Sequence, residues 1–366
     1  MNTTQRVRRA GLAAVAALVI GGSGVAIGAA AADSSASGTL AAATATQSPA
    51  APATPPGLKG PGPASYASVV RKVLPSVVLI RTEDGLGSGV VLDTKGNIVT
   101  NAHVAGNATR FQVQVAGDTA PRSARLVGTY PPDDLAVIRA DDSSGLQPAT
   151  FGDSGTVQAG DVVLAIGNPL GLSGSVTQGI ISATDRAVTE PATDGSPAAT
   201  LPGAIQTSAP INPGNSGGAL VSASGQVVGI PTLAAGSPQG GGQAQGIGFA
   251  IPSNLARDIA TQIIDTGHVT NSHRAAIGAE VATVLGPDGT AGGVGVVAVT
   301  SGGGAERAGL RAGDVITAVG GAQTTDTTAL SQALAAAEPG DTVTVTISRD
   351  GQDRSVQVTL GELPGS

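Results

Sequence analysis

The chain has 366 residues, which is enough for two or three domains. It carries 19 Lys and Arg against 26 Asp and Glu, a net charge of −7, and only 1% aromatic residues. Without surplus positive charge or aromatic side chains for base stacking, nucleic acid is not expected as a partner. The chain has no Cys, which excludes disulfides, thiolate metal sites and a Cys nucleophile. It has three His, at positions 103, 268 and 273, so few residues are available as an imidazole base.

The composition of the first 65 residues predicts a targeting segment followed by a spacer. Arg6, Arg8 and Arg9 precede an uncharged apolar stretch over 10–32. This pattern predicts an export signal over 1–32, either a cleaved signal peptide or a retained N-terminal membrane anchor. Residues 33–65 are rich in Ala, Pro, Ser and Thr and poor in large aliphatic side chains, which predicts a disordered tether or a cleaved propeptide.

Short β-branched segments dominate the central part of the chain. We expect a short helix from Ser65, as its N-cap, to Leu74, followed by two groups of six strands. The first group is 76–81, 87–93, 97–100, 111–115, 122–129 and 135–139, and the second is 161–167, 176–183, 204–207, 219–221, 227–231 and 246–250. Turn residues between them predict paired antiparallel barrels. A helix capped by Ser253 is expected to follow and to end at Gly267.

A third unit follows the two remaining His residues. Strands are predicted at 293–300, 314–319, 342–349 and 355–360, with a helical turn at 305–308 and a helix at 327–337. About 90 residues are enough for such a β-rich module to fold alone.

A glycine-rich turn over 212–218 places Ser216 where backbone N–H groups can face a substrate. The N–H groups of Gly214 and Ser216 would then form an oxyanion hole for the charge that develops on a carbonyl oxygen. The alternative is an ordinary turn with an incidental Ser.

A Ser nucleophile needs a base and a third group that orients the base. His103 follows the predicted strand 97–100, and Asp134 directly precedes an apolar strand, where a carboxylate is easily buried. The neighbouring Asp133 is the competing carboxylate. Each of these residues could occur in such a position by chance, but the occurrence of all three in the order His, Asp, Ser is far less probable by chance.

These residues lie in segments that closely resemble the HtrA/Deg serine proteases. The segments are Gly87–Val90, Thr100–Val104, Asp134–Val137, Ile166–Pro169, Ile205–Thr207, Asn212–Gly218, Gly246–Pro252 and Ala305–Ile316. The resemblance covers roughly residues 66–360. It implies a mainly β fold, in which a chymotrypsin-like double six-stranded β-barrel (66–267) precedes a small PDZ β-sandwich with two helices (274–362). It also implies the catalytic triad His103, Asp134 and Ser216.

The sequence also offers two alternatives to this triad. Ser154, in the segment Phe151–Gly155, resembles the nucleophile motif of digestive trypsin-like enzymes, but it comes too early, before a second barrel can form. The Gly214-x-Ser216-x-Gly218 spacing also fits the nucleophile elbow of an esterase, which would need His268 or His273 as base.

The segments around Ser216 also predict specificity. Pro210 stands six residues before Ser216, where trypsin-like enzymes that accept Arg or Lys carry an acid. A pocket formed by Pro210, Ile247, Gly248 and Phe249 is expected to accept small or medium aliphatic side chains. Extended substrate would pair with the strand edge near Gly246.

Together these features predict an exported, ATP-independent serine endopeptidase of the bacterial cell envelope, which cleaves unfolded or misfolded proteins through an acyl-enzyme.

The resemblance implies that Ile277, Gly278 and Ala279 bind the carboxylate of a captured C-terminus. It also implies a homotrimer, for which Tyr66 is the one N-terminal aromatic residue. No cofactor and no metal are expected. The alternatives are a latent-protease chaperone or PDZ-based stress sensor, and a serine esterase.

Overall fold

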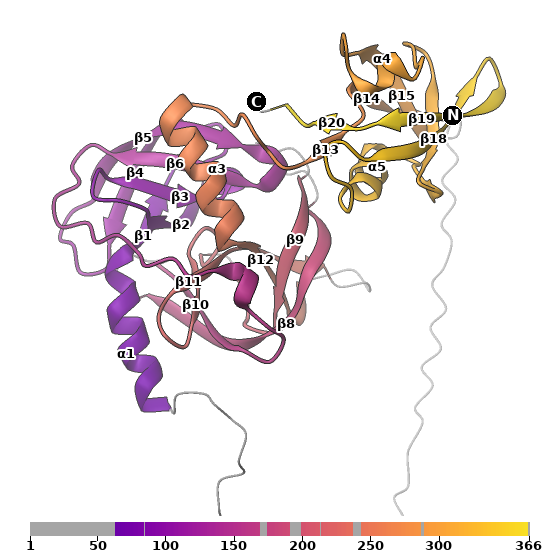
Figure 1. Ribbon diagram of the computed structural model, residues 1–366. Coiled ribbons are helices and arrows are strands. Elements are labelled where there is room, and N and C mark those ends of the chain that lie inside the picture. Colours follow the sequence, from indigo (N-terminus) through magenta and orange to yellow (C-terminus); the bar gives the residue numbers. More distant parts are fainter. Residues whose placement is uncertain are drawn as a thin grey trace, which may run out of the picture. The chain divides into compact units, whose positions relative to one another are not determined.

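The computed structural model describes residues 63–364 except 84, 169–173, 191–198, 213, 237–242 and 287–288 (Figure 1). The predicted export signal therefore lies outside the described residues, as does the predicted tether up to residue 62. The first helix, α1 (Pro63–Val73), begins before Ser65, so the prediction of Ser65 as its N-cap is wrong. Proline suits a first helical turn, where the N–H that it lacks would have no partner. None of the described helices is long and apolar enough to span a membrane.

The first six strands close into a barrel, as predicted. Their order around the barrel is β1-β2-β3-β6-β5-β4. The strands are β1 (Val77–Arg81), β2 (Leu86–Val91), β3 (Asn97–Thr100), β4 (Arg110–Val115), β5 (Arg122–Tyr130) and β6 (Leu135–Ala140). Two short helices, α2 (Ala102–Ala105) and the 3-10 turn η2 (Pro131–Asp133), follow β3 and precede β6. Because β3 and β6 are paired, these two helical turns lie at one end of the same strand pair.

The second six strands close into a barrel in the order β10-β11-β12-β9-β8-β7. They are β7 (Val162–Gly167), β8 (Ser175–Glu190), β9 (Ala199–Thr207), β10 (Ala219–Ser222), β11 (Val227–Gly236) and β12 (Gln243–Pro252). Strands β8 and β9 are longer than predicted because they continue as a paired ribbon, in which Val188 lies opposite Leu201. The double six-stranded barrel is confirmed.

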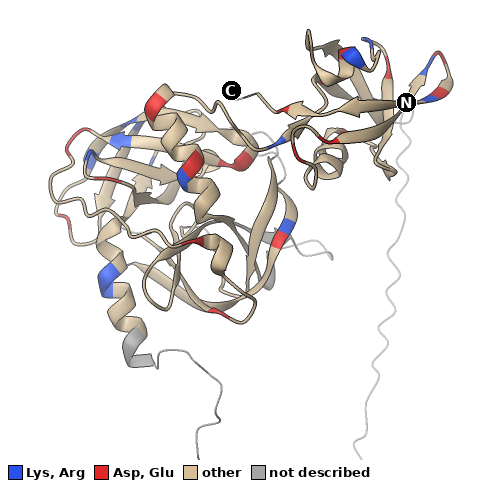
Figure 2. Cartoon of the chain, in the orientation of Figure 1, with Lys and Arg blue, Asp and Glu red and all other residues tan. Residues whose placement is uncertain are grey.

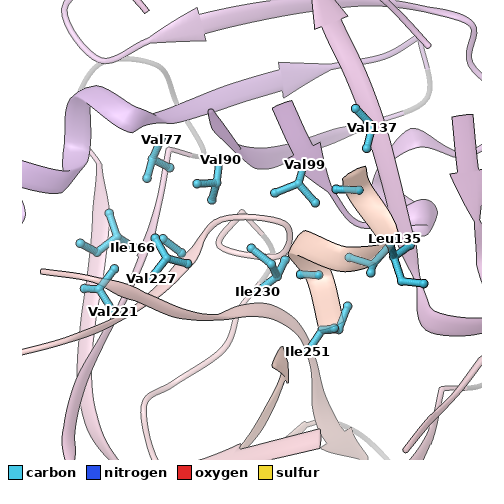
Figure 3. Close-up of a cluster of buried hydrophobic side chains, with 14 of the residues drawn as sticks. Val77, Val90, Val99, Leu135, Val137, Ile166, Val221, Val227, Ile230 and Ile251 are labelled. Carbon is cyan, nitrogen blue, oxygen red and sulfur yellow. The ribbon is translucent and has the colours of Figure 1, made fainter. Parts of the chain in front are cut away.

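The two barrels share a hydrophobic core. Figure 3 shows Val77, Val90 and Val99 of the first barrel facing Ile166, Ile230 and Ile251 of the second. Branched aliphatic side chains fill this interface, each worth about 1.5–3 kcal/mol when fully buried. The packing holds the loops of one barrel against those of the other, and α3 (Ser253–Thr266) adds Ile259 and Ile263 to the same core.

Ser253 does not cap α3 as predicted. The N-cap position belongs to Pro252, and the Ser253 hydroxyl instead donates to the carbonyl of Gly152, 2.9 Å away. The buried hydroxyl thereby joins the start of the helix to the segment between the barrels.

The C-terminal module is a small β fold with two helices, as predicted. Its sheet has the order β14-β15-β16-β18-β19, with β17 paired to β16, and β13 pairs separately with β20. The elements are β13 (Ala275–Ala276), β14 (Ala279–Leu285), β15 (Ala291–Val299), α4 (Gly304–Arg307), β16 (Val315–Val319), β17 (Ala322–Gln323), α5 (Thr327–Leu334), β18 (Thr342–Arg349), β19 (Gln352–Thr359) and β20 (Gly361–Glu362). Strand β14 was not predicted, and it lies at an edge of the sheet.

Charged residues are sparse and of mixed sign over the described part of the chain. Figure 2 shows acidic and basic positions interspersed, for example along α3, which carries Arg257, Asp258 and Asp265.

Candidate active site

The carboxylate of Asp134 is buried at the end of η2, with its side chain 2% exposed. Its backbone adopts a left-handed conformation (φ 51°), which Asp tolerates better than most residues. The Asp134 carbonyl accepts hydrogen bonds from the N–H of Ala102 and from the side-chain amide of Asn101, at 3.0 and 3.1 Å. The turn before β6 is thereby fixed to the start of α2.

His103 lies in α2 and is bonded twice to Asp134. Its backbone N–H donates to Oδ1 and its Nδ1 contacts Oδ2, each at 2.9 Å. Because an ionised carboxylate only accepts hydrogen bonds, Nδ1 carries the proton and the lone pair of the neutral ring is on Nε2. This tautomer is the one that a general base of a Ser nucleophile requires.

Thr232 connects the carboxylate with the predicted nucleophile. Its hydroxyl donates to Asp134 Oδ2 at 2.5 Å, in the range of charge-assisted O–H···O⁻ bonds. Its backbone carbonyl accepts the hydroxyl of Ser216 at 3.0 Å. One residue of β11 in the second barrel thus contacts both Asp134 of the first barrel and Ser216, and the predicted triad residues are brought to one place.

The turn before β10 presents Ser216 with its neighbouring amides. Gly214 has φ 107°, a conformation that favours glycine, and Asn215 braces the turn by donating its side-chain amide to the carbonyl of Pro210. Within the part of the chain that the structure describes, the N–H groups of Gly214 and Ser216 donate to no acceptor. These are the two amides that the sequence predicts for an oxyanion hole.

The competing candidates lie in other surroundings. The Ser154 hydroxyl accepts the N–H of Asn254 at the start of α3. His268 Nδ1 contacts the carbonyl of Thr266, and His273 Nε2 contacts Asp258. Ser216 bonds to Thr232 and to neither of these His residues, so the structure offers nothing in favour of the esterase assignment.

Asp133, the neighbour of Asp134 in the sequence, contacts a different partner. Its buried Oδ1 accepts from Arg274 Nη1 at 3.0 Å, and the same guanidinium donates to the carbonyl of Pro132. Burial raises the pKa of Asp133 to about 6, against the opposing effect of Arg274. Asp133 therefore ties the segment after α3 to the turn that delivers Asp134.

The residues expected to form the specificity pocket do not share one face. Gly248 faces Ile211, whose Cγ1 would lie 2.4 Å from a Cβ at position 248. Phe249 follows on the opposite face of β12 and is buried in the core between the barrels. Ile247 is exposed, and Pro210 is exposed while its carbonyl binds Thr177 and Asn215. Gly248 with Ile211 is the pair that the structure brings together.

In the C-terminal module, the segment 277–279 leads into the edge strand β14. A cavity of about 170 Å³ lies beside it, lined by Ala279 and Val281 of β14 and by Leu330 and Leu334 of α5. Among the described residues, the N–H groups of Ile277 and Gly278 donate to no acceptor. The segment predicted to bind a carboxylate therefore combines free donors with an apolar groove.

Sequence reasoning missed three residues of this region, Thr232, Ser88 and Ile211. Thr232 contacts a residue 98 positions away, and Ser88 contacts Gly214 across 126 positions. Two of them had a local signal: Ser88 lies in the segment Gly87–Val90 that carries the family resemblance, and Ile211 directly follows Pro210 in the segment predicted to form the pocket.

Two family models and several known proteins match this chain. The models of two families match, a trypsin-like peptidase domain over residues 87–230 and a PDZ domain over 269–360. The chain is 40% identical to serine protease PepD of Mycobacterium tuberculosis, over 86% of this chain and 69% of that protein. It is 35% identical to the periplasmic pH-dependent serine endoprotease DegQ of Escherichia coli, over 81% and 70%. A solved structure of the HtrA-type protease AlgW with a decapeptide has a TM-score of 0.53 and 34% identity, covering 82% of this chain and 99% of that one.

The raised pKa of Asp133 predicts a pH-dependent stability difference. Below pH 3.8 the carboxyl is protonated in both the folded and the unfolded chain. The stability that it contributes there is lost as the pH rises towards 6, because the unfolded chain ionises first. Across this window, the free energy of unfolding of the wild type should fall relative to Asp133→Asn by about 2–3 kcal/mol. Chemical denaturation of both chains at a series of pH values measures the difference, and a difference independent of pH would contradict the assignment.

Proposed function

Because this chain belongs to the HtrA family of serine endopeptidases, we propose that His103, Asp134 and Ser216 are its catalytic triad and that cleavage proceeds through an acyl-enzyme. The observation that carries the proposal is the continuous set of contacts from His103 to Asp134 to Thr232 to Ser216. These contacts join residues of both barrels at one site.

In the proposed mechanism, the Ser216 hydroxyl turns from the Thr232 carbonyl to His103 Nε2. Its oxygen adds to the scissile carbonyl carbon while its proton passes to the imidazole, and Asp134 stabilises the imidazolium. The N–H groups of Gly214 and Ser216 receive the oxyanion. Collapse of this adduct breaks the C–N bond, and the imidazolium protonates the departing amine. Water then adds to the ester in the same way, which releases the new carboxylate and restores Ser216.

We infer that the specificity pocket is shallow because Ile211 occupies the space in front of Gly248. The side chain of Ile211 is buried, and the missing Cβ at Gly248 is what allows this close approach. The residue six positions before Ser216 is the uncharged Pro210. Small aliphatic side chains therefore suit the site better than Arg, Lys or aromatic side chains.

The PDZ module is proposed to capture C-termini of protein substrates. Strand β14 has an unpaired edge that can accept an added strand, and Ala279 and Val281 alternate towards the groove with Leu330 and Leu334. Ile277 lines the same groove, and its N–H group together with that of Gly278 is proposed to bind a terminal carboxylate.

The substrates are proposed to be unfolded or misfolded proteins of the cell envelope. The basic and apolar N-terminal sequence favours export, and the relative DegQ is named as periplasmic. Membrane anchoring through residues 1–32 and assembly into a homotrimer remain part of the proposal. Tyr66, the aromatic residue expected at a trimer interface, packs partly against the core of its own chain, and its hydroxyl accepts from Gln178 at 3.3 Å.

Substitution of the two candidate nucleophiles tests the catalytic assignment. Ser216→Ala should lower the rate of casein cleavage by about a thousandfold or more, because it removes the attacking oxygen. Ser154→Ala is the matched control and should retain cleavage within about twofold, since Ser154 bonds to Asn254 outside the site. Loss of cleavage in Ser154→Ala alone would contradict the proposal. A wild-type chain that binds casein without cleaving it would favour the latent chaperone.

Truncation of Ile211 tests the pocket. Ile211→Ala should shift kcat/KM by about tenfold towards substrates with Leu or Phe before the scissile bond, relative to Val. Ile181→Ala removes the same atoms from the same hydrophobic cluster, but Ile181 is not among the atoms nearest to Gly248, so the change should lower stability without changing the preference. Equal preference profiles for the two variants, measured on a peptide library, would contradict the inferred pocket.

Peptide binding tests the PDZ groove. A peptide with a small apolar last residue and a free carboxylate should bind the full-length Ser216→Ala chain, and amidation of its C-terminus should weaken binding by about tenfold or more, because charged acceptors form the stronger hydrogen bonds. Leu334→Glu should weaken binding, whereas Val297→Glu changes an exposed side chain on the neighbouring strand and should not. Fluorescence anisotropy measures the affinities, and equal affinity for acid and amide would overturn the proposed carboxylate capture.

A further inference from the structure

Ser88 of β2 is fully buried, and its hydroxyl is bonded on both sides. It accepts the backbone N–H of Asn168 at 2.8 Å and donates to the carbonyl of Gly214 at 2.6 Å. Because a hydroxyl has one hydrogen and Asn168 supplies a donor, that hydrogen is committed to Gly214. A side chain of the first barrel therefore holds a peptide group of the turn that presents Ser216.

The backbone of Ser88 contacts the same turn. Its N–H donates to the carbonyl of Ser216 at 3.0 Å, so Ser88 binds the carbonyls of both residues that supply the proposed oxyanion-hole amides. This approach depends on missing side chains. A Cβ at Gly217 would lie 2.3 Å from the Ser88 carbonyl oxygen, and one at Gly167 would lie 2.5 Å from the Gly214 oxygen.

The peptide group held by the Ser88 hydroxyl lies between the two peptide groups that carry those amides. Its oxygen is bound by Ser88, and its N–H, from Asn215, donates to the carbonyl of Asn212 at 3.1 Å. Gly214 has no Cβ and does little to resist rotation of this peptide by itself. Rotation would turn the neighbouring N–H groups away from the position of a developing oxyanion, and the Ser88 hydroxyl adds a restraint from outside the turn to the one that Asn212 supplies within it.

We propose that Ser88 is a positioning residue for the oxyanion hole, which rests on the proposed function of Gly214 and Ser216. Its hydroxyl orients the Gly214–Asn215 peptide and thereby aims two amides at the charge that develops in the transition state. Substrate binding in the ground state depends less on this orientation, because the carbonyl oxygen carries little charge before attack.

The test compares Ser88→Ala with wild type in the full-length chain, on a chromogenic peptide ending in Val. The kcat should fall by about 10- to 100-fold while KM stays within about twofold, because one misplaced donor costs part of what a removed donor costs. The affinity for a peptide aldehyde, which forms a tetrahedral adduct with Ser216, should fall by a similar factor. If the Ser88 hydroxyl had a purely structural role, its removal would change neither kcat nor the affinity for the aldehyde.

Ser253→Ala is the matched control. Ser253 is equally buried, and its hydroxyl likewise donates to a glycine carbonyl, that of Gly152, which lies outside the turn 212–218. Its loss should lower the melting temperature with kcat unchanged. If Ser88→Ala does not fold, Ser88→Cys, which offers a weaker donor of similar size, takes its place.

A kcat within twofold of wild type in the folded Ser88 variant, with a melting temperature lowered as in Ser253→Ala, would overturn the inference. This outcome is distinct from failure of the proposed function. If the proposed function were wrong, the wild type itself would not cleave the peptide, or the Ser216→Ala variant would cleave it as fast as the wild type.

Discussion

The buried carboxylate of Asp134 is the point on which the arrangement of the site depends. An ionised carboxylate removed from water is stable only when donors surround it. Three donors do so here, the backbone N–H and Nδ1–H of His103 and the hydroxyl of Thr232. Two belong to the first barrel and one to the second, so the charge can be satisfied only when the barrels are docked. The core of Val, Ile and Leu side chains between the barrels stabilises their docking. The bonds to the Asp134 carboxylate fix how the two barrels are aligned with each other.

The turn around Ser216 obeys a second constraint, close approach of backbone to backbone. Gly167, Gly217 and Gly218 each lie where a Cβ would collide with a backbone oxygen of a neighbouring segment. Because these glycines have no side chain, β2 and the end of β7 can pack directly against the backbone of the turn. The front of the turn, with the N–H groups of Gly214 and Ser216, is left open. The large Gly content of the chain thus has a definite structural use at this position.

The sequence was most informative where a local pattern carries the information. Alternating β-branched segments predicted both barrels, and the segments around His103, Asp134 and Ser216 identified the residues that the structure brings together. Edge strand β14 was missed because its inward face is only half-buried and has just two hydrophobic residues against the core, Ala279 and Val281. The starts of α1 and α3 were misplaced because Ser65 and Ser253 resemble N-caps, whereas Pro63 begins one helix and tertiary contact with Gly152 uses the other hydroxyl. The bonds of Thr232 and Ser88 join residues 98 and 126 positions apart, so the segment Gly87–Val90 could carry a family resemblance without showing which residue Ser88 contacts.

The most direct measurement of the central claim is the site of covalent labelling by a fluorophosphonate, which reacts with an activated Ser hydroxyl. The full-length protein should gain the mass of one label, and peptide mapping should place it on Ser216, with labelling lost in His103→Ala. A label on Ser154, or labelling of Ser216 at an unchanged rate in His103→Ala, would contradict activation of Ser216 by the His103–Asp134 pair.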